Sequence, residues 1–93
     1  MKIRYGGHSY HVTVGFSSIG KVKEVFVHGS KVGSEMDFLL DDFCVVTSLL
    51  FQSGIGPAEL LPSLGLVDDQ PISLVAMIIK TASDLETKRY CEE

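Results

Sequence analysis

The chain has 93 residues, which is long enough for one hydrophobic core and too short for two. Hydrophobic residues make up 45% and charged residues 22%, a globular composition that excludes a disordered tail or a low-complexity linker as the main content. The net charge of −4 argues against a dedicated nucleic-acid-binding protein, because that function usually shows a basic surplus. We expect a single domain over residues 1–93.

The first third of the chain predicts strands. Apolar and polar side chains alternate over residues 10–16, with Tyr10, Val12, Val14 and Phe16 on one side and His11 and Thr13 on the other. Residues 22–28 are rich in β-branched and aromatic residues and follow a turn at residues 17–20. With a short segment before Gly6-Gly7, the pattern predicts strands over about 2–6, 9–16 and 21–28.

The period changes at Gly33-Ser34, where Ser34 can cap a helix. Apolar residues then recur at helical spacing: Met36, Leu39, Phe43, Val46 and Leu50, widened by Leu40, Cys44, Leu49 and Phe51. Gly54 suits the end of this helix, and prolines near residues 57 and 71 open two more. The predicted helices are about 34–53, 57–64 and 71–88. The fold class is therefore α+β, with a two- or three-stranded antiparallel meander followed by three helices on one face.

Charge is divided unevenly along the chain. Residues 1–33 hold five bases and one acid, a balance of +4, whereas residues 34–93 hold three bases and eleven acids, a balance of −8. All three histidines, His8, His11 and His28, lie in the basic part. Two interpretations stay open: two solvated faces that differ in sign, or a basic sheet surface that meets an anionic partner or the acidic helices of another copy.

No signal peptide is visible, and the longest uninterrupted apolar run, residues 74–79, is far shorter than a membrane span. We expect a cytoplasmic protein without membrane contact. The helices offer more apolar surface than three short strands can cover, which predicts a homodimer. The side chains expected in or next to the interface are Met36, Leu39, Leu40, Phe43 and Leu50.

The residues capable of chemistry do not form a recognisable site. His8 and His11 are three apart on a strand and face opposite ways, so no metal or other cofactor is expected. Cys44 lies in an apolar helical pattern that is typical of packing, and Cys91 stands beside terminal acids that would not activate it. Catalysis by this chain alone is therefore not expected.

Local geometry favours one binding site, the link over residues 29–34. There a strand ends, Lys31 and Gly33 follow, and the free N–H groups of a helix begin at Ser34, which suits a phosphate or carboxylate. His28 and His11 on the basic sheet are included in this candidate site. The Gly-Lys-Ser/Thr spacing of a nucleotide-binding loop is absent, so a glycine-bearing helix entry without a ligand stays open as the alternative.

Several segments resemble the TSCPD domain family over roughly residues 10–82. They are Val12-Thr13-Val14-Gly15-Phe16, Gly20, Glu24-Val25-Phe26-Val27, Gly29, Lys31, Gly33-Ser34, Gln52-Ser53-Gly54-Ile55 and Pro57-Ala58-Glu59-Leu60. This family occurs near the C-terminal end of cobalamin-dependent ribonucleotide reductases and as short stand-alone proteins in bacteria and phages. The family's Thr-Ser-Cys-Pro-Asp motif falls near residues 68–72, where only the proline, Pro71, is present.

Two functions follow as hypotheses. The resemblance implies a non-catalytic interaction or regulatory module, dimeric, that binds an anionic or nucleotide-bearing partner through the link at Lys31 to Ser34 and the basic sheet. The alternative is a small enzyme or a subunit of a ribonucleotide-reductase-type complex, using His11 or His28 with a carboxylate across a dimer cleft.

Overall fold

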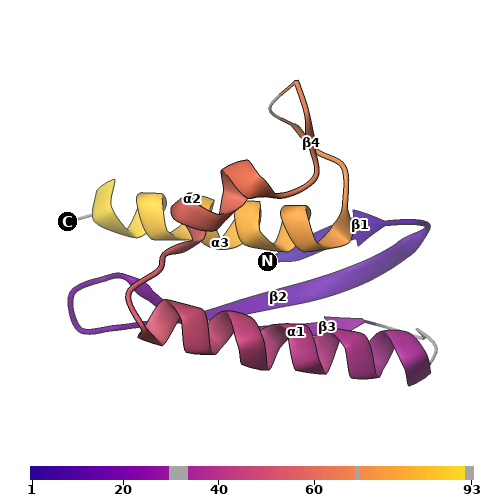
Figure 1. Cartoon of the computed structure of the whole chain (residues 1–93), viewed down its shortest axis with the longest axis horizontal. Helices are drawn as coiled ribbons and strands as arrows, with labels where there is room; N and C mark the ends of the chain where they lie inside the picture. Colours follow the sequence, from indigo (N-terminus) through magenta and orange to yellow (C-terminus); the bar gives the residue numbers. More distant parts are fainter. Residues whose placement is uncertain (30–33, 69, 92–93) are drawn as a thin grey trace.

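The computed structural model describes residues 1–29, 34–68 and 70–91, with backbone alone at residues 34, 35 and 89–91. Its elements confirm the α+β class (Figure 1). In chain order they are β1 (Lys2–Tyr5), β2 (His8–Phe16), β3 (Val22–Gly29), α1 (Ser34–Gln52), α2 (Pro57–Leu60), a 3₁₀ turn (Leu61–Ser63), β4 (Leu66–Val67), β5 (Gln70–Pro71) and α3 (Leu74–Cys91).

The first three strands form an antiparallel sheet in the order β1-β2-β3. Gly6 and Gly7 join β1 to β2 with φ of 58° and 80°, a pair of left-handed conformations that suits a two-residue hairpin turn and favours glycine. In the β2–β3 register, Val12 pairs with Val27 and His11 pairs with His28. Alternation along the strands makes one face of the sheet apolar and buried, whereas the other faces solvent and, apart from Phe26, carries mainly polar side chains.

α1 lies along β3, the edge strand of the sheet (Figure 1). Its buried side chains recur every three to four residues, and they are Leu40, Cys44, Thr47 and Phe51. Three of them join the buried valines of β2 and β3 in the main core cluster. The side chains of Leu39 and Val46, which the periodicity grouped with the apolar stripe, are instead 62% and 58% exposed.

α3 supplies the other side of the core, and α2 packs on α3. Ile78 and Ile79 of α3 are almost completely buried. The helix begins at Leu74, three residues after the predicted start, because Pro71 pairs with Leu66 in the small β4–β5 hairpin. Ser73 then caps the helix, accepting a hydrogen bond from Ala76 N at 3.0 Å.

Among the described residues, none of the helices taken singly has both the length and the apolar composition to cross a membrane. Within the same described part of the chain, the pair Met36–Gln52 and Pro57–Ser63, bent by 111°, reaches that length and composition together.

Candidate functional site

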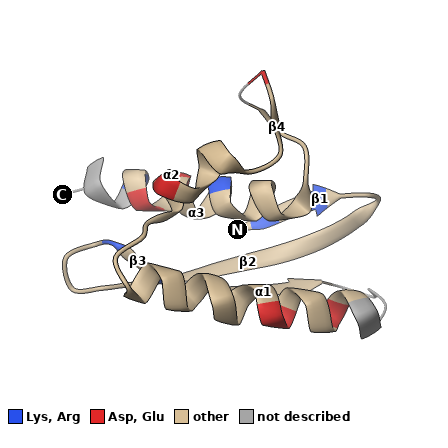
Figure 2. Ribbon diagram, in the orientation of Figure 1, with Lys and Arg blue, Asp and Glu red and all other residues tan. Residues whose placement is uncertain are grey.

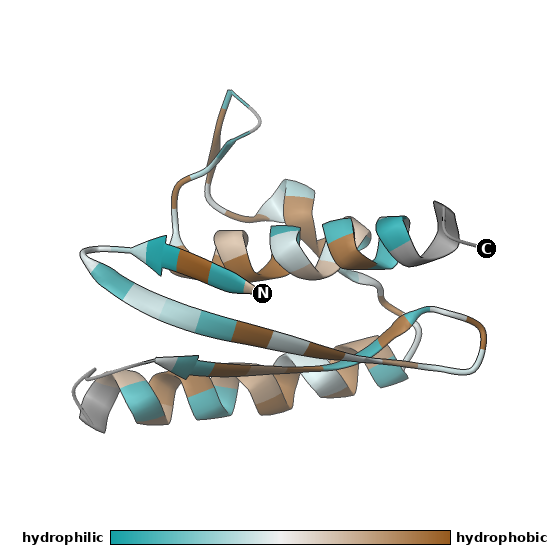
Figure 3. Ribbon diagram, turned by 180° about the vertical axis from the view of Figure 1, so that it is seen from behind, coloured by the Kyte–Doolittle hydropathy of each residue, from teal (hydrophilic) through white to brown (hydrophobic). Residues whose placement is uncertain are grey.

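The outward side of α1 is apolar along most of its length. Five side chains, here called the α1 stripe, are each 58–69% exposed: Phe38, Leu39, Val45, Val46 and Leu49. Hydrophobic residues recur along the whole of this helix (Figure 3). Asp42 interrupts the stripe near its middle. Contiguous apolar surface of this kind on a small domain marks an interaction site more often than a catalytic one.

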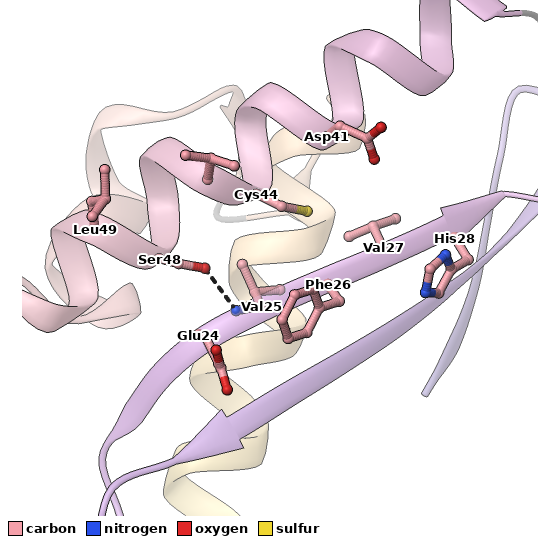
Figure 4. A pocket seen from close by; sticks show the side chains of 10 residues that line it. Glu24, Val25, Phe26, Val27, His28, Asp41, Cys44, Ser48 and Leu49 are labelled. Carbon is pink, nitrogen blue, oxygen red and sulfur yellow. Dashed lines mark hydrogen bonds between the residues drawn. The ribbon is translucent and has the colours of Figure 1, made fainter.

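A groove of about 410 Å³ lies between α1 and β3 (Figure 4). Its walls are mainly apolar and include Val25, Phe26 and Val27 from β3 and Cys44, Val45 and Leu49 from α1. Val45 and Leu49 belong to both the groove and the α1 stripe. The two features therefore form one apolar surface that extends from the helix to the sheet.

Two side chains of α1 cover the free edge of β3 inside this groove. Ser48 Oγ accepts a hydrogen bond from Val25 N at 3.1 Å (Figure 4), and the Cys44 thiol accepts one from the backbone of Val27. Burial raises the pKa of the Cys44 thiol, the hydrogen bond from Val27 opposes that change, and the nearby Asp41 carboxylate adds to it. Cys44 is therefore a protonated packing residue rather than an activated nucleophile.

Glu24, Asp41 and His28 also line the groove, and these residue types could in principle serve acid–base chemistry. Among the side chains that the structure describes, however, the one ion pair joins Lys80 to Asp84 at 3.2 Å. Within the same residues, no three His, Cys, Asp or Glu side chains gather closely enough to hold a metal ion. The groove thus offers contact surface and no assembled proton-transfer pair.

A second candidate site lies on the solvent-facing side of the sheet. The register places Lys2, His11 and His28 in one row across β1, β2 and β3, with all three side chains exposed. A hollow of about 310 Å³ lies against this row and is lined also by Ser9 and Tyr10. Figure 2 shows the division of charge that the sequence predicts, with bases on β1 and acids on α1.

A family model for the TSCPD domain matches residues 1–82. The chain belongs to the TSCPD domain family. This match confirms the resemblance seen in the sequence and extends it over β1. No curated protein and no solved structure matches this TSCPD domain.

The structure of this TSCPD domain places the predicted binding residues in two groups. His11 and His28 become direct cross-strand neighbours, a pairing that the sequence did not indicate. Lys31 and Gly33 lie outside the described residues. Ser34 is the first residue of α1, and its side chain is not among those described. The anion site at the 29–34 link therefore stays a prediction, and the part with a described geometry is the histidine pair.

The predicted dimer residues also divide. Leu40 lies in the core of the TSCPD domain with 3% of its surface exposed, so it is not available to a partner. Met36 and Phe43 are partly buried against the core, and Leu50 is partly buried as well. Of the predicted set, only Leu39 belongs to the α1 stripe. The α1 stripe has four further members outside the predicted interface set, and they are Phe38, Val45, Val46 and Leu49.

Proposed function

We propose that this TSCPD domain is a non-catalytic interaction module that forms a homodimer through the α1 stripe. The observation that carries the proposal is the exposure of 58–69% at each of five neighbouring apolar side chains on one helix. Fully burying a Val, Leu or Phe side chain contributes roughly 1.5–3 kcal/mol. A stripe of this composition therefore gains stability wherever it finds a complementary apolar surface.

A second copy of the same stripe is such a surface, and the charges of α1 favour an antiparallel arrangement. All four acids of the helix, Glu35, Asp37, Asp41 and Asp42, lie in its first half, and it contains no base. Parallel pairing would place acid on acid, whereas two-fold antiparallel pairing lays each acidic half on the uncharged half of the partner. The seven-residue spacings of Phe38 with Val45 and of Leu39 with Val46 suit helix-on-helix packing.

The oligomeric state tests the proposal directly. By size-exclusion chromatography with light scattering, we expect a dimer for the unmodified chain and a monomer for Val45→Glu and Leu49→Glu at micromolar concentration. Val67→Glu is the matched control, because Val67 is 53% exposed and lies on the β4–β5 hairpin, away from α1 (Figure 1). A monomeric unmodified chain, or equal loss of the dimer in the control, would contradict the proposal.

Helix direction can be tested separately by disulfide formation in a Cys91→Ser background. A mixture of Phe38→Cys and Leu49→Cys chains should cross-link to each other, because antiparallel pairing brings these two positions together. Self-cross-linking of Phe38→Cys alone would instead indicate parallel helices. Cys44 is 8% exposed and should stay out of this reaction.

Family membership supports a second proposal, which concerns the protein partner of the dimer. We infer that the dimer serves as an accessory or regulatory part of a ribonucleotide-reductase-type complex in the cytoplasm of a bacterium or of a phage-infected cell. Mixing the purified domain with the reductase of its host should shift the reductase in sedimentation velocity. An unchanged reductase peak at saturating domain concentration would contradict this assignment and leave the dimer proposal intact.

A further inference from the structure

The solvent-facing side of the sheet, here called the open face, has a definite chemical order. Along β3 its side chains are His28, Phe26 and Glu24, and same-face neighbours on a strand lie about 6.7 Å apart. Phe26 is 49% exposed, which is unusual for a large aromatic ring on a small domain with buried valines on both sides of it. A donor, an aromatic ring and an acceptor therefore follow one another along the strand.

The donor end is extended across the sheet by Lys2 and His11. Their row with His28 crosses three strands and spans about 10 Å, because adjacent strands lie about 4.8 Å apart. Arg4 lies on the same face of β1, two residues after Lys2 and paired with Ser9 of β2. Its Nη1 donates a hydrogen bond to Ser9 Oγ at 3.2 Å. One end of the open face thus gathers two bases and two imidazoles in a chain whose net charge is −4.

The acceptor end is held in place by a close contact. The side chain of Glu24 lies over Gly15, its cross-strand partner, so closely that a Cβ on Gly15 would lie 2.8 Å from Glu24 Cγ. Glycine at this position leaves room for the carboxylate on the open face beside Phe26. The face is consequently polarised, with donors and cations at one end and a carboxylate at the other.

We propose that the open face binds a nucleoside phosphate, with the base stacked on Phe26 and the phosphate on Lys2, His11 and His28. Exposed aromatic rings on sheet surfaces stack bases, and cationic and imidazole donors bind phosphate oxygens. In this pose Glu24 can accept a hydrogen bond from an exocyclic amine of the base. The separation between His28 and Phe26 is of the same order as that between the phosphate and the base of a nucleotide. A free nucleotide and single-stranded nucleic acid share this chemistry.

Lys2 and His11 of this site lie away from the α1 stripe, whereas Phe26 lines the groove that also includes Val45 and Leu49 of the stripe. Asp37 and Asp41 of α1 line a shallow hollow together with His28, so His28 has acids on its helix side and bases on its sheet side. The phosphate is therefore expected nearer to Lys2 and His11 than to the α1 side of His28.

Isothermal titration calorimetry and amide chemical shifts test the proposal on the full chain, with four probes: AMP, adenosine, inorganic phosphate and a single strand of about ten nucleotides. We expect AMP to bind at least about tenfold more tightly than adenosine or phosphate, because it makes both contacts. His11→Gln should weaken AMP binding about tenfold through loss of a phosphate contact. His8→Gln is the matched control, because His8 lies on the same strand with the side-chain direction of Tyr10, on the opposite face.

Tight binding of the oligonucleotide would assign the ligand to nucleic acid, and binding of AMP without the oligonucleotide would assign it to free nucleotides. If inorganic phosphate bound as tightly as AMP, the proposed stacking of the base on Phe26 would be overturned. Equal losses in His8→Gln and His11→Gln, or no saturable binding of either nucleotide probe at millimolar concentration, would overturn the site. The same titration with Leu39→Glu separates the two proposals, because Leu39 belongs to the α1 stripe but does not line the groove beside Phe26, so loss of the dimer should leave AMP binding unchanged.

Discussion

Removing the Ser48 hydroxyl should destabilise the domain, because this hydroxyl covers part of the free edge of β3. Val25 is completely buried, and its N–H donates to Ser48 Oγ at 3.1 Å. Ser48→Ala leaves this donor without its partner, and an unsatisfied buried donor costs about 1–3 kcal/mol. The groove is open to solvent on one side, so water can partly replace the hydroxyl and the lower half of that range applies. We therefore expect a loss of about 1–2 kcal/mol in the free energy of unfolding.

Urea unfolding followed by circular dichroism measures this loss. With an m-value of about 1–1.5 kcal/mol/M for a chain of this size, the midpoint should fall by roughly 1 M. All variants are compared at one protein concentration, because dimerisation would add a concentration-dependent contribution. Ser53→Ala is the control. Ser53 is exposed, directly follows the last residue of the same helix, and donates its hydroxyl to Leu50 O at 2.7 Å. Equal midpoints for the two variants, or a loss below about 0.5 kcal/mol for Ser48→Ala, would refute the reasoning.

Three further predictions concern the core and its edges. Ile78→Ala should cost about 2–5 kcal/mol in urea unfolding, because Ile78 is fully buried and the change leaves a cavity. Glu86→Gln should cost about 1 kcal/mol by the same assay, because Val22 N donates to the Glu86 carboxylate at 2.6 Å and a neutral acceptor binds more weakly. Burial raises the pKa of Cys44, so the folded state holds its proton longer than the unfolded state, and stability should fall as the pH rises above about 9. Cys44→Ala should remove that part of the pH dependence, and an identical slope in both proteins would contradict it.

The strands could be predicted closely because their signal is local. β2 runs over residues 8–16 where the sequence predicts 9–16, and β3 over 22–29 where it predicts 21–28. Alternation over residues 10–16 places every second side chain on one face, whatever the rest of the chain does. The pairing of His11 with His28 was not predictable in the same way. It depends on the register set by the turn after Phe16 and by the irregularity between Gly15 and Phe16, which no periodicity encodes.

The predicted start of α3, residue 71, is wrong for a different reason, since the helix begins at Leu74. Proline opens many helices, and the sequence pattern predicts that role for Pro71. Pro71 instead pairs with Leu66, and Ser73 provides the cap through its hydroxyl. The signal was present in the sequence, since a serine directly before an apolar helical run is itself a good N-terminal marker. Two valid markers two residues apart cannot be ranked without knowing that residues 66–71 form a hairpin.

The rotation of α1 about its axis is the feature on which the proposed function depends, and periodicity could not determine it. The helix is apolar on most sides, so turning it would exchange buried residues such as Leu40 and Phe51 for exposed ones such as Leu39 and Val46 with little change in buried apolar area. What distinguishes the rotations is the edge of β3. Only the observed one directs Ser48 at the backbone of Val25 and brings the Cys44 thiol to the backbone of Val27.

Covering the strand edge therefore has a consequence on the far side of the helix. Each backbone donor left unpaired would cost about 1–3 kcal/mol, whereas the choice of apolar face is nearly neutral within one chain. The side of α1 that carries Ser48 and Cys44 consequently faces the sheet edge, and Phe38, Leu39 and Val46 face solvent. A partner that covers these side chains lets one helix protect an edge strand and bury its apolar surface together. Ser48→Ala should therefore weaken folding, because it removes a hydrogen bond at the edge of β3. Val45→Glu should weaken association, because it places a charge in the α1 stripe of the same helix.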